Sequence, residues 1–178
     1  MRRFSILMSG ILLLTLSSCA TTDQGRDEGD ASVEETAGTN QPSWYSALTT
    51  SKSDSASFTG FARAVSADRE EARELSEQTA IKNLRFEIDR YAEEIRRELT
   101  AGGANGSLES AAFIRNLRNA VESMPVGDAM TETEFFGEGS VVHAFTRVSI
   151  SSQAVIDMLS AQINHDDFVE LLRQKAAS

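Results

Sequence analysis

The sequence predicts an α+β domain, in which a three-stranded antiparallel sheet with a β-α-β-β core is packed on one face by a long helix. Three patterns favour this fold. Residues 57–65 alternate as a strand does, residues 68–99 repeat apolar side chains at helical spacing, and residues 129–150 contain two strand-like runs around a turn. An inserted helical hairpin and C-terminal helices complete the predicted domain, which we place at residues 42–178.

The first predicted strand carries mostly small side chains on one of its two faces. The residues of that face are Phe58, Gly60, Ala62 and Ala64. Small residues in a strand mark a place where another element approaches the backbone closely. We therefore expect the helix that follows to lie against this face.

The long helix is expected to begin at a capping box formed by Asp68 and Glu71. Its apolar stripe consists of Ala72, Leu75, Ala80, Leu84, Ile88, Tyr91, Ile95 and Leu99. Its predicted solvated face consists of Glu70, Glu74, Glu77, Arg85, Glu87, Glu93, Arg96 and Arg97. At 1.5 Å per residue the helix would be about 48 Å long. Its second half should therefore project beyond the sheet and pack on another helix.

The remaining elements follow from turn residues and apolar spacing. The glycine-rich residues 100–107 should end the long helix, and residues 107–124 are amphipathic and complete a helical hairpin. After Pro125, Gly137-Glu138-Gly139 connects two strands, 129–136 and 140–150, as a β-hairpin. Two helices should follow, one capped by Ser151 or Ser152 and a shorter one that starts at Asp167.

Residues 1–18 have the pattern of an export signal, with Arg2 and Arg3 followed by a short apolar run. That run is too short to span a bilayer as a mature helix. Leu16-Ser17-Ser18-Cys19 then matches the bacterial lipobox. The match implies diacylglycerol attached to the Cys19 sulfur and cleavage between Ser18 and Cys19. The alternatives are an ordinary secretory signal that leaves Cys19 as a free thiol and, less favoured, a twin-arginine signal.

Residues 19–41 read as the lipidated cysteine followed by a disordered acidic tether. Residues 20–41 carry six acids, and about 22 flexible residues would reach roughly 25 Å on average. A partner-binding role for this acidic run is the alternative. Ala20 follows Cys19, and the absence of an aspartate there favours the outer membrane. The side of that membrane on which the domain lies is left open.

The overall charge limits the classes of partner. The formal net charge is −10, and removal of Arg2 and Arg3 with the signal would make it two units more negative. An acidic chain repels nucleic acid and anionic headgroups, so we expect no nucleic-acid partner and attachment to the membrane by the lipid alone. Because Cys19 is the only cysteine, no internal disulfide is available.

No pattern of catalytic residues is present, so the sequence predicts neither an enzyme nor a cofactor. His143 and His165 lie on different predicted elements, and Asn164-His165-Asp166-Asp167 reads as a turn and helix cap instead of a metal site. Trp44 and Tyr45 open the domain. Trp44 is expected to pack on the core, with contact to a partner or ligand as the alternative.

Several segments together resemble the LPP-twenty lipoprotein family and the N-terminal domain of the flagellar assembly protein FlgT. They are the lipobox, "PSWY", "FTGFARAVSADREEARELSEQTAIKNL" and "FFGEGSVVHAFTRVSI". The resemblance covers about residues 42–160 and rests on Trp44, Gly60, Ala64, Ala72 and Ala80. Ser76, at a place often held by alanine, and the helical hairpin depart from the family pattern. The resemblance implies a β-α-β-β core and an envelope role, and it supplies no catalytic residues.

Two functional hypotheses follow. The first is a non-enzymatic lipoprotein of the cell envelope, anchored at the outer membrane and binding other envelope proteins or further copies of itself. The second is a module that binds a small ligand or the cell wall through Trp44, Tyr45 and the exposed face of the sheet.

Overall fold

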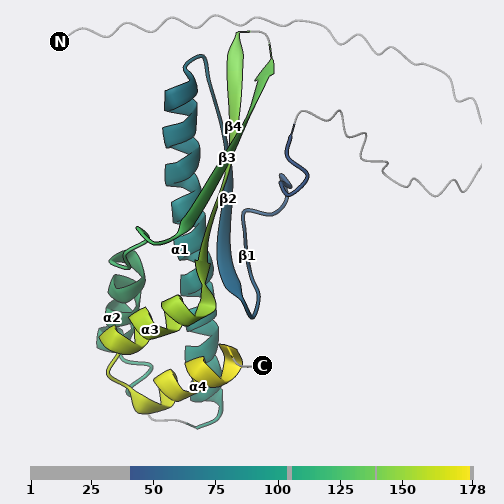
Figure 1. Cartoon of the computed structure of the whole chain (residues 1–178). Coiled ribbons are helices and arrows are strands. Elements are labelled where there is room, and N and C mark those ends of the chain that lie inside the picture. The colour runs from purple at the N-terminus through teal and green to yellow at the C-terminus, as the bar shows by residue number, and fades with distance from the viewer. Residues whose placement is uncertain (1–40, 104–105, 139, 177–178) are drawn as a thin grey trace, which may run out of the picture. The chain divides into compact units, whose positions relative to one another are not determined.

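One antiparallel sheet holds the strands in the order β1-β2-β4-β3. The strands are β1 (Ser51–Ser53), β2 (Ser57–Ser66), β3 (Met130–Glu138) and β4 (Val141–Ser151). The computed structural model, shown in Figure 1, describes residues 41–103, 106–138 and 140–176, all of which belong to one compact unit, Ala37–Ser178. The long strands β2 and β4 pair along their whole length, from Ser57 opposite Ser151 to Ser66 opposite Val142.

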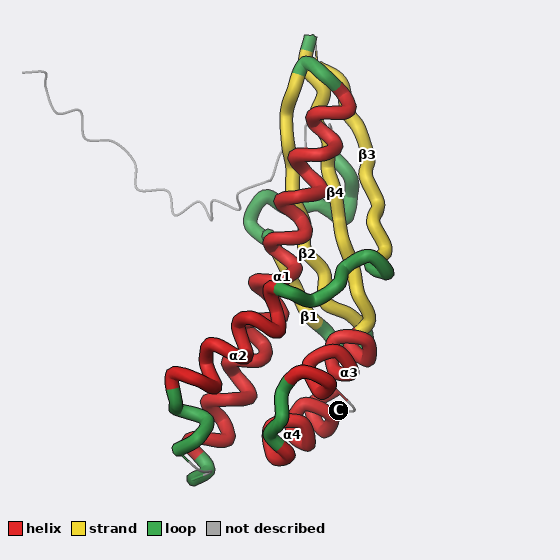
Figure 2. The backbone as a smooth tube through the Cα atoms, turned by 90° about the vertical axis from the view of Figure 1, so that its left-hand side faces the viewer, coloured by secondary structure: helices red, strands yellow, loops and turns green. Residues whose placement is uncertain are grey.

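Helix α1 (Arg69–Ala101) runs along one face of this sheet, which confirms the predicted long helix and its position (Figures 1 and 2). The contact is closest at Gly60. A Cβ atom built there would lie 2.1 Å from the carbonyl oxygen of Ala80 and 2.4 Å from the backbone nitrogen of Leu84. Only glycine therefore allows the backbones of β2 and α1 to come this close.

The N-terminus of α1 is capped as predicted, with one added participant. The side chain of Asp68 accepts a hydrogen bond from the backbone N–H of Glu71. The Glu71 carboxylate does not return to the backbone N–H of Asp68. Instead, Ser66 accepts from that N–H and donates to Glu71. Ser66 at the end of β2 thus connects the Glu71 carboxylate to the backbone N–H of Asp68, which the two residues of a capping box usually join directly.

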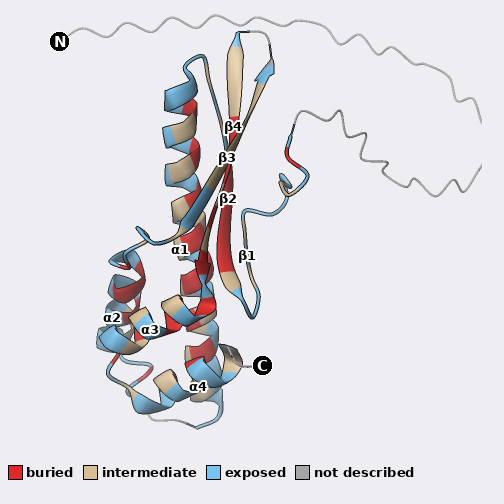
Figure 3. Ribbon diagram, in the orientation of Figure 1, coloured by how far each residue is buried: buried red, intermediate tan, exposed pale blue. Residues whose placement is uncertain are grey.

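Three further helices pack at the end of α1 that extends beyond the sheet. They are α2 (Ala111–Glu122), α3 (Ser152–Gln162) and α4 (Asp166–Ala176). Figure 3 shows buried segments continuing from the sheet into this helical part. The fully buried side chains there include Ile95, Leu108, Leu117, Leu159, Phe168 and Leu172. Among the described residues, no helix combines the length and the apolar character needed to cross a bilayer.

The predicted α+β class is correct, but the predicted number of strands is wrong: the sheet has four strands, not three. The missed strand is β1, whose three residues, Ser-Lys-Ser, carry no apolar side chain that would mark a strand. It forms a hairpin with β2 through a turn in which Asp54 Oδ1 accepts the backbone N–H groups of Ala56 and Ser57. The side chains of Ser51 and Ser53 in β1 also form hydrogen bonds with Glu87 of α1.

Two assignments of side chains on α1 are also corrected. Glu87 was expected on the solvated face, but only 3% of its surface is exposed. Leu75 was expected in the buried stripe, yet 45% of it is exposed, and Ser76 is buried in its place. Both buried polar side chains are hydrogen-bonded to hydroxyl groups of the sheet: Ser76 to Thr146, and Glu87 to the two serines of β1.

Candidate interaction surface

The candidate surface is the face of the sheet opposite α1. Because side chains alternate along a strand and the strands pair in register, alternate residues of β2, β4 and β3 share this face. Those residues are Thr59, Phe61, Arg63, Val65, His143, Phe145, Arg147, Ser149, Met130, Glu132, Glu134 and Phe136. The face mixes aromatic rings with charged side chains, whereas the strand residues that face α1 carry no charge.

Residues 41–50 lie over part of this face and bring Trp44 and Tyr45 onto it (Figure 1). The Trp44 ring stacks on Phe61 with 6.1 Å between centroids, and the Tyr45 ring meets Phe145 edge-on at 4.8 Å. The segment is joined to β2 by a hydrogen bond of 2.8 Å from the Phe61 N–H to the Thr50 carbonyl. The expected packing of Trp44 at the start of the domain is thus observed, on the face opposite the long helix.

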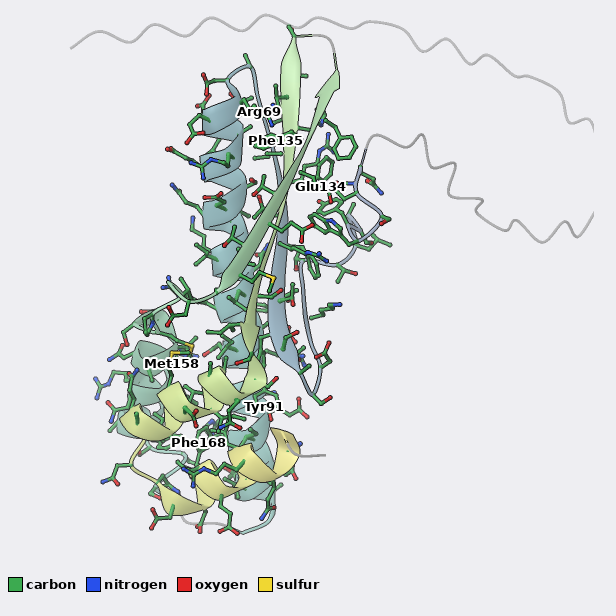
Figure 4. All side chains as sticks on the ribbon, viewed as in Figure 1. Arg69, Tyr91, Glu134, Phe135, Met158 and Phe168 are labelled. Carbon is green, nitrogen blue, oxygen red and sulfur yellow. The ribbon has the colours of Figure 1, made fainter. Side chains whose placement is uncertain are left out.

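The polar groups of this cluster are bonded to one another. Trp44 Nε1 donates to Glu134 Oε1 at 2.6 Å, and the Arg147 guanidinium lies 5.2 Å from the Trp44 ring. Arg147 also forms an ion pair with Glu132 on the neighbouring strand. In Figure 4, Glu134 lies on the side of residues 41–50, whereas Phe135 of the same strand lies near Arg69 of α1. The cation of Arg69 is 4.0 Å from the Phe135 ring.

These contacts describe what Trp44 and Tyr45 do within the chain. Both side chains are half-buried, and the indole N–H is already used by Glu134. Neither residue lines any of the four cavities described for residues 41–176. Contact of these two residues with a ligand or partner stays a prediction.

A cavity of about 300 Å³ lies where the β1–β2 turn meets α1, α3 and α4. Its charged lining is already paired: Arg90 binds Glu87, and Lys175 binds Glu98 at 2.6 Å. These hydrogen bonds to carboxylates raise the pKa of both cations. Burial raises the pKa of the Tyr91 phenol, which also borders the cavity. The cavity therefore mixes polar and apolar groups, and its cations are paired with carboxylates of the same chain.

Two further hollows adjoin each other along α1 and α2 and share Phe86, Asp89 and Arg118. Phe86 is 63% exposed there. Burial, followed by the nearby charge of Glu93, raises the pKa of the Asp89 carboxyl. Cations and anions alternate around the two hollows, so they carry no strong charge of one sign.

Glu87 is the residue that sequence reasoning missed. Its carboxylate accepts hydrogen bonds from Ser51 Oγ at 3.0 Å and Ser53 Oγ at 2.7 Å, and it pairs with Arg90. The hydrogen bond from Arg90, followed by those from the two serines, holds the Glu87 pKa below its usual value despite burial. A signal was present in the sequence, because Glu87 follows Ala80 and Leu84 at the spacing of the apolar stripe.

The other predicted residues are distributed as follows. Ser18, Cys19, the signal segment 1–18 and all of the predicted tether segment 19–41 except Gln41 lie outside the described residues. His143 accepts hydrogen bonds from Arg63, and His165 lies against Ser107, so the two histidines lie in different parts of the fold. Among the described residues, no group of three or more His, Cys, Asp and Glu side chains is placed to hold a metal ion.

Comparison with known proteins finds no matching family model, no match among the curated proteins and no match among the solved structures.

Proposed function

We propose that this protein is a lipid-anchored lipoprotein of the bacterial cell envelope that acts as a non-enzymatic protein-interaction or assembly module at the outer membrane. The observation that carries the proposal is the sequence Leu16-Ser17-Ser18-Cys19 directly after a short apolar run. Lipid on Cys19 would hold the domain at the bilayer, since each buried methylene contributes about 0.8 kcal/mol and two or more chains resist exchange.

The described domain supports an interaction role in two ways. The sheet offers a face rich in aromatic and arginine side chains, which are the residue types enriched at protein interfaces. Its buried or half-buried acids, such as Glu87 and Glu134, are bound to neighbouring groups that hold elements together. A role in holding structure accounts for these acids without any reaction.

We also propose that the chain is related to the LPP-twenty family, which it resembles in sequence. Three of the residues on which the resemblance rests, Gly60, Ala72 and Ala80, lie where β2 and α1 meet or are buried in that layer. Ser76, which departs from the family pattern, is buried and bonded to Thr146 Oγ1 at 2.7 Å. The Thr146 hydroxyl on β4 therefore explains how serine can replace alanine at this buried position.

The anchor is tested with the full chain expressed in a Gram-negative host that is fed a clickable fatty acid. We expect the wild-type protein to incorporate the label, to enter the detergent-rich phase and to have the mass of a chain that begins at an acylated Cys19. Cys19→Ser should remain unlabelled and uncleaved. Ser17→Ala, which keeps a small residue in the lipobox, is the matched control and should behave as wild type. A mature wild-type protein without fatty acid would overturn the anchor.

The proposed location in the outer membrane is tested by substituting Ala20, the residue after the cysteine. Ala20→Asp should move the labelled protein from outer-membrane to inner-membrane fractions, and Ala20→Ser should leave it in the outer membrane. Wild-type protein found in the inner membrane would contradict the proposed location while leaving lipidation intact.

A further inference from the structure

The sheet has two end strands, and they differ in length and in protection. β1 is three residues long, and its serines are tied to Glu87 of α1. β3 is nine residues long and pairs only with β4 among the strands of the sheet. Figure 2 shows β3 at the margin of the sheet, and no described element pairs with its outer side.

Apart from its acidic side chains, β3 lacks the features that usually block pairing at a sheet edge. Its register with β4 is continuous from Met130 opposite Ser149 to Glu138 opposite Val141, so the strand has no bulge. It contains neither proline nor lysine. Every second residue of an antiparallel strand directs its N–H and C=O away from its partner, so β3 presents a row of backbone groups to an incoming strand.

The side chains of β3 give this edge a definite chemistry. Glu132 and Glu134 share the face on which Trp44 lies, about 7 Å apart along the strand. Arg147 binds Oε2 of Glu132, and Trp44 binds Oε1 of Glu134. Within the described residues, the second oxygen of each carboxylate accepts no hydrogen bond. Thr131, Thr133 and Phe135 alternate with these acids on the opposite face.

Charge repulsion disfavours two possible occupants of the outer edge of β3: a second copy of the chain and the acidic residues 20–41. A second copy paired antiparallel about Thr133 would place Glu132 directly opposite Glu134, and pairing about Glu134 would place Glu134 opposite itself. Like charges at directly opposed positions destabilise a strand pair. Residues 20–41 carry six acids and would meet the same repulsion.

We propose that the outer edge of β3 binds an extended segment of another protein, and that this segment carries Lys or Arg at alternate positions. The segment adds a fifth strand to the sheet. Its basic side chains face Glu132 and Glu134, and its alternate residues, β-branched or small, lie beside Thr131, Thr133 and Phe135. Backbone hydrogen bonds supply the attachment, and the two acids select the partner. This inference rests on the proposed interaction role and is independent of lipidation at Cys19.

The test uses the full-length protein in a non-ionic detergent and the labelled peptide Thr-Lys-Val-Lys-Val-Lys-Thr. We expect saturable binding by fluorescence anisotropy, weakened by salt. Two control peptides separate the contributions: one with Glu in place of Lys, and one with the same lysines but methylated at alternate backbone nitrogens. Neither should bind. Equal binding of the methylated peptide would overturn strand addition, and absence of binding by the basic peptide would overturn the proposal.

The site is tested by substitution and by hydrogen exchange. Glu132→Gln with Glu134→Gln should weaken binding of the basic peptide roughly five- to tenfold. Glu74→Gln with Glu109→Gln changes the same net charge at exposed positions outside the sheet and should change binding less than about twofold. Circular dichroism confirms that both pairs of variants are folded. Equal effects of the two pairs would overturn the role of the β3 acids.

Bound peptide should slow amide exchange in residues 130–138 and not in residues 51–53. Protection confined to the hollows beside Phe86 would overturn the assignment to β3. Concentration-dependent dimers whose β3 amides are protected without peptide would replace the basic partner with a second copy. The fatty-acid mass of the same preparation reports on the anchor separately, so either proposal can fail alone.

Discussion

Helix α1 covers one face of the sheet with small and apolar contacts, whereas residues 41–50 cover the other face with aromatic rings and charged groups. On the α1 side, Gly60 lets two backbones touch, and Ala62, Leu84 and Val148 are buried. On the opposite side, Trp44 and Tyr45 are only half-buried, although the rings beneath them, Phe61 and Phe145, are buried.

Helix α1 and residues 41–50 are held on the sheet by different kinds of contact. The α1 face depends on shape, because an added atom at the contact has no space to occupy. The face under residues 41–50 depends on a few side-chain contacts and a short stretch of backbone hydrogen bonding. Such a cover should open at a lower free energy than the helix layer. Four predictions test this contrast, beginning with the largest effect.

Gly60→Ala should destabilise the domain by about 3 kcal/mol or more, since its Cβ would meet the backbone of α1. Urea unfolding followed by far-UV circular dichroism measures the loss. Gly137→Ala is the matched control, because it lies on the same sheet and has nothing within 4 Å of the added Cβ. It should be neutral or slightly stabilising. Similar losses for the two variants would contradict a close contact at Gly60.

Glu87→Gln should cost about 2 kcal/mol at neutral pH, because it removes the charge that Arg90, Ser51 and Ser53 hold in a buried site. The pKa of Glu87 is lowered by folding, so its contribution is complete above the ordinary value of 4.5 and is lost as pH falls through the lower folded value. The difference in unfolding free energy between wild type and variant should therefore shrink in acid. A difference that stays constant from pH 7 to pH 3 would contradict this ion pair.

Ser76→Ala should cost about 1 kcal/mol, since the Ser76 hydroxyl is bonded to Thr146 within the α1 layer. Thr146 keeps Thr133 as a second partner at 2.9 Å, which limits the loss. Ser76→Ala combined with Thr146→Val should cost less than the sum of the two single changes. Thr79→Ala, on the exposed side of the same helix, is the control and should be nearly neutral. Additive costs would show that the two hydroxyls are not coupled.

Glu134→Gln should have the smallest effect, at most about 1 kcal/mol, because its contact with Trp44 is only half-buried. Trp44 is the only tryptophan, so its fluorescence reports on residues 41–50 alone. In the variant, the fluorescence change should occur at lower urea than the loss of helix measured by circular dichroism. Glu109→Gln, at an exposed position, should leave the two transitions unchanged. If the fluorescence and circular dichroism transitions of Glu134→Gln coincide, residues 41–50 and α1 unfold together.

The elements whose residues carry a signal of their own could be predicted from the amino-acid sequence. Asp68 and Glu71 marked the start of α1, and apolar spacing marked its course. Alternation around a glycine-bearing turn predicted the hairpin of β3 and β4, but the predicted turn was too long, because Gly137 and Glu138 belong to β3 and pair with β4. The small face of β2 also predicted the contact with α1, because a missing side chain can be read directly from the sequence. For the candidate surface, Trp44 and Tyr45 were identified from their residue types, but not the face on which they lie.

β1 follows from contacts that exist only in the folded chain, and the same contacts explain how a charged side chain can be buried at the stripe position of Glu87. A three-residue polar segment has no pattern that favours a strand, and it becomes one because β2 supplies backbone partners and Glu87 accepts from its two serines. Glu87 in turn is buried because those serines and Arg90 replace the water that its carboxylate would lose. The hydrogen bonds between Glu87 and the two serines join residues more than thirty positions apart, and local propensity carries no information about that pairing.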